Sequence, residues 1–171
     1  MMFNVVLFEP EIPPNTGNII RLCANTGAQL HLIKPLGFPL EHSKLRRAGL
    51  DYHEFANIKI YENWTDFLKT TGTNLKRVFA LTTKGQGTLL QCSFLENDYF
   101  VFGSETKGIS DEVRASIPKE NHIVLHPTRF QIQVTTSTFL YRILTQSNHD
   151  KDDPDDAQSL YSTPSTCFQN S

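Results

Sequence analysis

The first 33 residues constrain the fold most strongly, because they alternate between two hydrophobic patterns. Asn4–Phe8 is a short apolar run rich in valine, which is typical of a buried strand. From Asn18 the apolar residues recur at helical spacing, and Gly27 closes this stretch as glycine commonly closes a helix. A second apolar run follows at residues 30–33. Strand, helix and strand in so short a span predict a β-α-β unit and therefore a parallel sheet.

Two prolines and a polar turn mark where the helix starts. Pro13 and Pro14 cannot continue a helix behind them, and Asn15-Thr16-Gly17 has the composition of an N-cap, so we expect the helix from residue 18. The rest of the chain continues the alternation. Further strands are expected at residues 55–60, 77–82, 99–102 and 123–125, and helices at 43–50, at 64–68 and from Ser110 to Pro118.

Length and composition set the class of protein. A chain of 171 residues fits one domain that buries a core without disulfides or a metal. Its three cysteines include no C-x-x-C pair, so neither a disulfide framework nor a zinc site is expected, and the expected location of the protein is the reducing cytoplasm. His122 and His126 have a metal-ligand spacing but lie in a strand-like stretch, so no metal site is expected. No apolar run reaches about 18 residues, so no membrane span is expected.

The net charge of −2 is unevenly distributed. Residues 150–171 contain five Asp and one Lys, which gives −4, so residues 1–149 carry +2. Nucleic-acid binders are often basic, so the net charge of −2 by itself argues against nucleic-acid binding. The charge of +2 on residues 1–149 removes that argument. We interpret residues 1–145 as the domain. Residues 146–171 are predicted to be a disordered acidic and polar tail, because they bury too little apolar surface to offset their ordering entropy.

Three loops follow predicted strands, at residues 9–18, 82–87 and 103–108. Ligands of open α/β sheets bind outside the carboxyl ends of the strands, so these loops are the expected site. Gly103 and Gly108 would let backbone N–H groups approach a ligand closely.

Polar residues in these loops are the candidate reactive groups. Glu105 offers an acceptor for a ribose hydroxyl, an amine or a cation, and Arg21 could steady a phosphate or a developing oxyanion beside Asn15. Each motif by itself also has an ordinary interpretation as a helix cap or a tight turn. In the same way, Arg46 and Arg47 are either a solvated face or a binding patch.

Four ordered blocks lie within residues 5–125. They are EPEIPPNTGNIIRLCANTG at residues 9–27, KLRRAGLDYHEF at 44–55, FALTTKG at 79–85 and FGSETKG at 102–108. Together they resemble the SPOUT class of RNA methyltransferases, and more narrowly the small tRNA (cytidine/uridine-34-2′-O)-methyltransferases. In the last block, Ser104 and Lys107 stand where that family usually has proline and arginine.

The resemblance implies an α/β fold, a parallel sheet with flanking helices that is closed by a trefoil knot. It implies 2′-O-methylation of the ribose of the tRNA wobble nucleotide, C or U at position 34. The implied cofactor is S-adenosyl-L-methionine, and the implied partners are the tRNA anticodon stem-loop and a second copy of the chain.

The resemblance also implies roles for individual residues. Arg21 would face the target 2′-hydroxyl, and Asn15 and Glu105 would shape the pocket. The backbone that would cradle the cofactor surrounds Leu81, Gly103, Gly108 and Leu125. RNA contacts would come from the second block, through Arg46, Arg47, Tyr52 and His53. Because arginine holds its proton very strongly, Arg21 would be a poor base, so we interpret it as a cation that orients the hydroxyl and stabilises the developing alkoxide.

The sequence departs from the family after Leu125. The family continues with a Ser-Arg-Ser segment, then Asn-Leu-Ser-Asn and an apolar helix that completes the knot, whereas residues 125–138 read LHPTRFQIQVTTST. A reading-frame shift near residues 126–129 is one explanation, and divergence is the other. The coding DNA distinguishes them, because only a frameshift leaves the missing motif in another frame.

Three functions therefore remain in competition. The first is wobble-nucleotide methylation, and the second is methylation of another tRNA or rRNA ribose. The third is non-catalytic RNA binding by a protein that kept the fold and lost the cofactor. A nicotinamide-dependent enzyme is disfavoured, because no G-x-G-x-x-G follows Asn4–Phe8.

Overall fold

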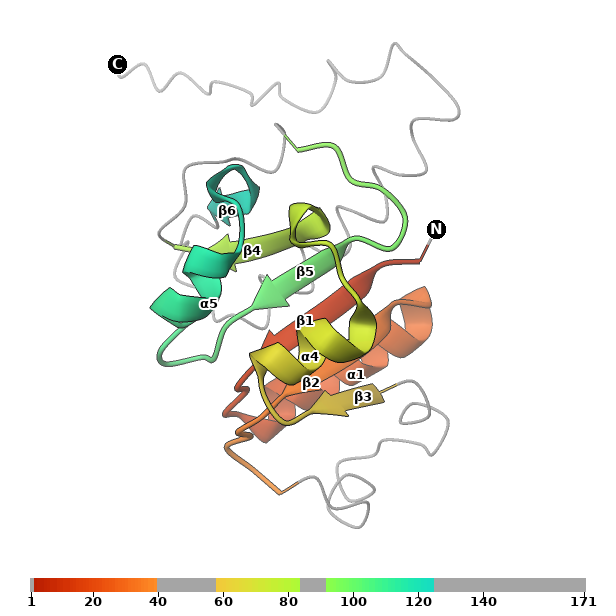
Figure 1. Cartoon of the computed structure of the whole chain (residues 1–171). Coiled ribbons are helices and arrows are strands. Elements are labelled where there is room, and N and C mark those ends of the chain that lie inside the picture. The colour runs from red at the N-terminus through yellow and green to blue at the C-terminus, as the bar shows by residue number, and fades with distance from the viewer. Residues whose placement is uncertain (1, 40–57, 84–91, 125–171) are drawn as a thin grey trace, which may run out of the picture.

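The computed structural model describes residues 2–39, 58–83 and 92–124 of the chain. In these residues six strands form one sheet with the order β3-β2-β1-β5-β4-β6, and every neighbouring pair is parallel (Figure 1). The strands are β1 (Asn4–Phe8), β2 (Gln29–Ile33), β3 (Ile58–Tyr61), β4 (Val78–Thr82), β5 (Tyr99–Phe102) and β6 (His122–Val124). The predicted parallel α/β sheet is confirmed.

Helices cover both faces of the sheet. Helix α1 (Pro13–Thr26) lies on one face, and α4 (Trp64–Thr71) and α5 (Asp111–Ser116) lie on the other (Figure 1). Two short 3-10 turns, η1 (Leu75–Arg77) and η3 (Lys119–Asn121), lead into β4 and β6. None of the helices in the described ranges has both the length and the apolar character needed to span a bilayer.

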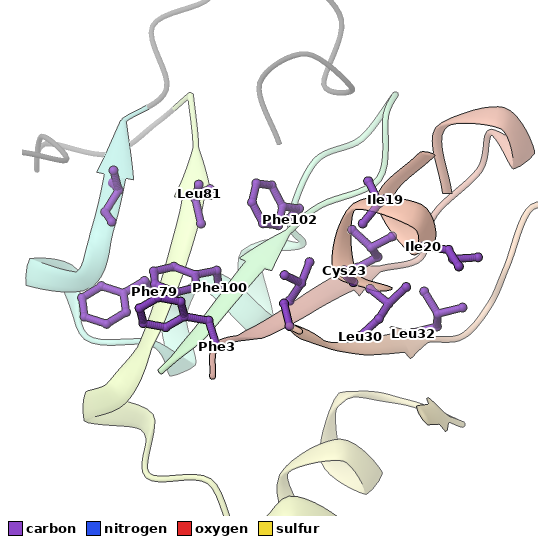
Figure 2. Packing of buried hydrophobic residues seen from close by; sticks show 14 residues of the cluster. Phe3, Ile19, Ile20, Cys23, Leu30, Leu32, Phe79, Leu81, Phe100 and Phe102 are labelled. Carbon is purple, nitrogen blue, oxygen red and sulfur yellow. The ribbon is translucent and has the colours of Figure 1, made fainter. Parts of the chain in front are cut away.

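The core divides into two apolar layers, because side chains alternate between the faces of each strand. On the α1 face, Ile19, Ile20 and Cys23 of the helix pack over the first strands, and aromatic residues fill the other half of the layer (Figure 2). There Phe79 and Phe100 stack with ring centroids 5.7 Å apart. The opposite layer is centred on Phe67 of α4, which is fully buried.

Several predicted boundaries need correction. Helix α1 begins at Pro13, five residues before the predicted start at 18. Proline suits the first positions of a helix, because their N–H groups have no partner within the helix and the fixed φ is already helical. Asn15 therefore lies inside the helix and is not its N-cap. The C-terminal prediction is confirmed, since Gly27 adopts φ 72° and its N–H donates to the carbonyl of Cys23.

The remaining differences are of one to three residues. Arg77 belongs to η1, so β4 starts at Val78, and β6 starts one residue earlier than predicted. Strand β3 runs to Tyr61, and helix α4 continues to Thr71. The predicted helix at 43–50, the knot-forming region and the tail at 146–171 lie outside the described residues.

The layer under α4 contains a buried histidine. His31 on β2 is 1% exposed and lies between two hydrogen-bond partners. The amide of Asn4 donates to the carbonyl of Asn97 at 3.1 Å, which leaves its oxygen facing His31 Nε2, also at 3.1 Å. Nε2 therefore carries the proton, and Nδ1 accepts from the hydroxyl of Tyr61 at 2.9 Å. Both ring nitrogens are satisfied only when the ring is neutral.

This neutral ring makes stability depend on pH. Burial, with a smaller contribution from the charge of Lys59, lowers the pKa of His31 from 6.5 to about 4. Below pH 6.5 the unfolded chain binds a proton that the folded chain does not. The contribution of His31 to the free energy of unfolding should thus be constant above about pH 6.5 and fall by about 3 kcal/mol between pH 6.5 and 4. Urea denaturation across this range should show a shallower fall for His31→Gln, and an unchanged slope would contradict the assignment.

Candidate functional site

Loops from three strands meet at the carboxyl edge of the sheet. Strand β1 lies between β2 and β5, so the loop after β1 (residues 9–12) adjoins the loop after β2 and the turn at 103–108 after β5. Hydrogen bonds between Glu105 and Glu11, and between Gly37 and Pro10, join these segments. Two of the three predicted loops are thus brought together, while residues 84–87 of the third loop lie outside the described residues.

The carboxylate of Glu105 caps helix α1 from across the sheet. It accepts from the backbone N–H groups of Glu11 at 2.8 Å and Ile12 at 3.3 Å, and from Nδ2 of Asn15 at 3.1 Å. Helix α1 needs an external cap because its N-cap residue, Ile12, has no side-chain acceptor. A negative charge at this end also interacts favourably with the helix dipole.

Asn15 and Glu105, which were predicted to share a pocket, are therefore in direct contact. A carboxylate has about four acceptor positions, and three of those on Glu105 are used by the start of α1. The first effect of Glu105 is to hold the helix against the turn. A role in contacting a ligand directly remains a prediction.

The turn at 103–108 depends on its two glycines for different reasons. Ser104 and Gly108 form a small antiparallel bridge, in which the N–H of Gly108 donates to the carbonyl of Ser104 at 2.9 Å. The turn folds back so tightly that a Cβ on Gly103 would lie 2.0 Å from the carbonyl carbon of Gly108. Gly108 itself has φ +72°, with open space around its Cα.

The unusual residue Ser104 fits this turn well. Its N–H donates to the carbonyl of Gly108 at 3.2 Å, a bond that the family's usual proline could not make. Its hydroxyl also accepts from the N–H of Lys107 at 3.2 Å. The departure at residue 104 is thus compensated locally, while the side chain of Lys107, the second departure, is exposed.

Arg21 lies on α1, six residues after Asn15 and thus about 9 Å further along the helix axis. Its side chain is partly exposed, and Nη1 donates to Oδ1 of Asn18, one turn earlier, at 3.4 Å. The guanidinium is therefore carried by the same helix that Glu105 caps.

The predicted cofactor residues lie on neighbouring strands. Leu81 near the end of β4 pairs with Phe102 of β5 on one side and with Ile123 of β6 on the other. The backbone that follows Leu81 consequently lies beside Gly103 (Figure 2 shows Leu81 and Phe102). The predicted cofactor residue Leu125 and the predicted RNA contacts Arg46, Arg47, Tyr52 and His53 lie outside the described residues.

Thr16, in the first turns of α1, has a buried hydroxyl without a hydrogen-bond partner among the described residues. The residue is 1% exposed and follows Asn15 directly. An unpaired buried hydroxyl costs about 1–3 kcal/mol of folding free energy.

In the described part of the chain, no group of three or more His, Cys, Asp or Glu side chains could hold a metal ion.

Replacing Thr16 with valine should not destabilise the protein. The substitution keeps the β-branched shape and removes the unpaired hydroxyl, so we expect the free energy of unfolding to rise by up to about 1 kcal/mol. Equilibrium denaturation in urea measures this directly. A loss of more than about 1 kcal/mol would show that the hydroxyl has a stabilising partner.

The sequence did not indicate three further residues of this edge. Glu11 and Thr106 are hydrogen-bonded to each other, with Thr106 Oγ1 donating to Glu11 Oε2 at 2.6 Å. Gly37 contacts the same loop, since a Cβ there would lie 2.7 Å from the Cα of Glu11. Glu11 and Thr106 lie within predicted loops and Gly37 does not, and nothing local in the sequence pairs Glu11 with a residue 95 positions away.

Comparisons with known proteins identify the family of the chain. The model of the SpoU rRNA Methylase family matches residues 2–137. The tRNA (cytidine(34)-2′-O)-methyltransferase of Burkholderia ambifaria is 54% identical over 124 residues, which cover 72% of this chain and 80% of that protein. A solved structure titled "Structural insights into the 2-OH methylation of C/U34 on tRNA" is 36% identical with a TM-score of 0.75, and the match covers 86% of this chain and 97% of that one.

A more distant structure shares the fold alone. The SpoU methyltransferase AviRb from Streptomyces viridochromogenes, in complex with AdoMet, is 17% identical with a TM-score of 0.66, covering 85% of this chain and 57% of that one. The family match and the 54% identical relative show that the chain is a methyltransferase. The chain belongs to the SpoU rRNA methylase family. The resemblance drawn from the four sequence blocks is confirmed.

Proposed function

We propose that this chain methylates the ribose 2′-hydroxyl of the wobble nucleotide of tRNA, a C or U at position 34, with S-adenosyl-L-methionine as the methyl donor. One observation carries the proposal: the chain is 54% identical, over 72% of its own length and 80% of the relative's, to a protein named tRNA (cytidine(34)-2′-O)-methyltransferase. The solved structure that concerns 2-OH methylation of C/U34 supports the same substrate at 36% identity.

The residues at the carboxyl edge suit this cofactor. Strands β4 and β5 are paired up to Leu81 and Phe102, so the backbone leaving both strands is available side by side for an adenosyl group. Gly103 contributes no side chain there, and Gly108 closes the turn behind it. When bound, S-adenosylmethionine supplies an electrophilic methyl group on a sulfonium, which an oxygen attacks in line.

Arg21 is the proposed catalytic residue. Its guanidinium stays protonated at neutral pH, so it orients the 2′-hydroxyl and stabilises the alkoxide that develops, and the proton leaves to water or phosphate. Asn15 and Glu105 contribute by fixing the helix that carries Arg21, as their contacts support.

The proposed setting is the one that the family resemblance implies. The enzyme would act in the cytoplasm as a homodimer on the tRNA anticodon stem-loop. Contacts to the RNA are proposed for the block at 44–55, through Arg46, Arg47, Tyr52 and His53. Phosphate contacts from such arginines make affinity for tRNA fall with rising salt, because bound counterions are released.

Methyl transfer to defined tRNAs tests the proposal. The full chain would be incubated with radiolabelled S-adenosylmethionine and tRNA transcripts that carry C or U at position 34. The all-ribose transcript should become labelled. A transcript in which only nucleotide 34 carries a 2′-deoxyribose should stay unlabelled. Equal labelling of the 2′-deoxy transcript would overturn the assignment to position 34.

The departure after Leu125 favours one alternative, a non-catalytic RNA-binding protein with the same fold. Calorimetric titration with S-adenosylmethionine separates the two functions. Binding at micromolar concentration supports the enzyme. Retained tRNA binding with no detectable cofactor binding supports the alternative.

A further inference from the structure

Glu11 is the residue at which three carboxyl-edge loops meet. Its N–H donates to Glu105 at 2.8 Å, and its own carboxylate accepts from the hydroxyl of Thr106 at 2.6 Å. On its other side, the N–H of Gly37 donates to the carbonyl of Pro10 at 2.9 Å. The backbones pack so closely there that a Cβ on Gly37 would lie 2.7 Å from the Cα of Glu11.

We call Glu11, Glu105 and Thr106 the clasp. Within it, the turn and the loop each supply an acceptor to the other: Glu105 accepts from the loop, and Glu11 accepts from the turn. Both acceptors are carboxylates, and hydrogen bonds to ionised acceptors are about twice as strong as neutral ones. The clasp therefore joins two segments that are more than 90 residues apart in the chain.

The two halves of the clasp restrict different movements. The bonds of Glu105 join the turn to the start of α1 through one flexible side chain, which accepts from three donors of the loop and the helix. The bond from Thr106 to Glu11 adds a second attachment through another pair of side chains, which narrows the range of orientations between the turn and the helix. Because α1 is a continuous helix, the orientation at its start is passed on to Arg21.

We propose that Glu11 and Thr106 are positioning residues, which hold the turn at 103–108 in a fixed orientation to α1 and so align Arg21 with the backbone around Gly103. The proposal rests on the proposed function, in which Arg21 faces the substrate hydroxyl and the backbone at Gly103 faces the methyl donor. Neither positioning residue contacts the reacting atoms. Misplacement of reacting groups by about 1 Å can cost on the order of a hundredfold in rate, so alignment alone is a sufficient role.

Thr106→Val tests the proposal, because it removes the donor and keeps the shape of the side chain. At saturating tRNA and S-adenosylmethionine, kcat should fall about tenfold. This factor corresponds to an activation free energy raised by about the strength of one hydrogen bond to a charged group. Thr106→Ser should recover most of that loss. Glu11→Ala should lower kcat by a similar factor, and the double variant should be no slower than the slower single one, because both changes break the same bond.

Thr70→Val is the matched control. The hydroxyl of Thr70 also lies near a carboxylate, Asp66 Oδ1 at 3.4 Å, but on the exposed surface of α4 on the other face of the sheet. Both threonines are exposed, so each variant should change Tm by less than about 4 °C. Only Thr106→Val should lower kcat.

Hydrogen exchange provides a readout that does not need activity. In Thr106→Val, amides of residues 9–17 and of 103–109 should both exchange faster, and Thr70→Val should change neither. Faster exchange with an unchanged kcat would overturn the proposal, and so would unchanged exchange in both segments. If the wild-type chain does not methylate tRNA but Thr106→Val still exchanges faster, the clasp stands and the proposed function fails.

Discussion

Replacing Arg21 with alanine is expected to lower kcat for tRNA methylation by at least about a hundredfold, the usual cost of losing one contact to a developing oxyanion. The side chain is partly exposed on α1, so the fold should survive the change. Single-turnover methylation with saturating cofactor measures the chemical step directly. Full activity in Arg21→Ala would reject the role of Arg21.

Two variants sharpen this result. Arg21→Lys should keep part of the activity, because a lysine retains the charge but not the geometry of the guanidinium. Arg114→Ala is the control, since Arg114 also contacts a residue three positions earlier on its helix, Asp111 at 2.6 Å. That pair lies on α5, on the other face of the sheet, and its loss should leave methylation unchanged.

Gly103→Ala should have the largest structural effect. The added Cβ would lie 2.0 Å from the carbonyl carbon of Gly108 and 2.2 Å from the nitrogen of Ile109, both of them backbone atoms. The turn must open or move, at a cost of about 3 kcal/mol or more. Calorimetric titration should show that S-adenosylmethionine binding is lost, and denaturation should show the fall in stability.

Gly108→Ala in the same turn is the internal control. Gly108 has φ +72° but nothing within 4 Å of an added Cβ, so alanine pays only for the left-handed backbone, about 1–2 kcal/mol. The variant should remain folded and lose less stability and less cofactor affinity than Gly103→Ala. Equal effects from the two substitutions would show that the close approach at Gly103 does not matter.

Much of the fold was predictable, because its signals are local. Buried strands of a parallel sheet are continuous apolar runs, and β1 and β5 were predicted with their observed bounds. The end of α1 followed from Gly27, whose left-handed backbone needs no distant partner. The start of α1 was misplaced, because Pro13-Pro14 can either stop one segment or begin the next. What makes it a beginning is the acceptor supplied by Glu105.

The candidate site was predictable as a set of residues but not as an arrangement. The motif around Asn15 and the motif around Glu105 were both found, and their side chains are in contact at 3.1 Å, while their role in a catalytic site stays a prediction. The contact with Thr106 gives Glu11 a role that the sequence did not indicate. A sequence pattern reports the neighbours of a residue along the chain, whereas this contact arises because the sheet places β1 beside β5.

The sequence by itself determined the parallel sheet, the family and the residues Arg21, Asn15 and Glu105 as candidates, because hydrophobic period, turn composition and motif are local properties. The tertiary structure decided how they are used. It placed a carboxylate 90 residues away against a helix that has no cap of its own, and turned Glu105 from an isolated acceptor into the group that holds α1. The physical reason is that a helix start with two prolines lacks internal partners, and strand order determines which distant loop can supply one.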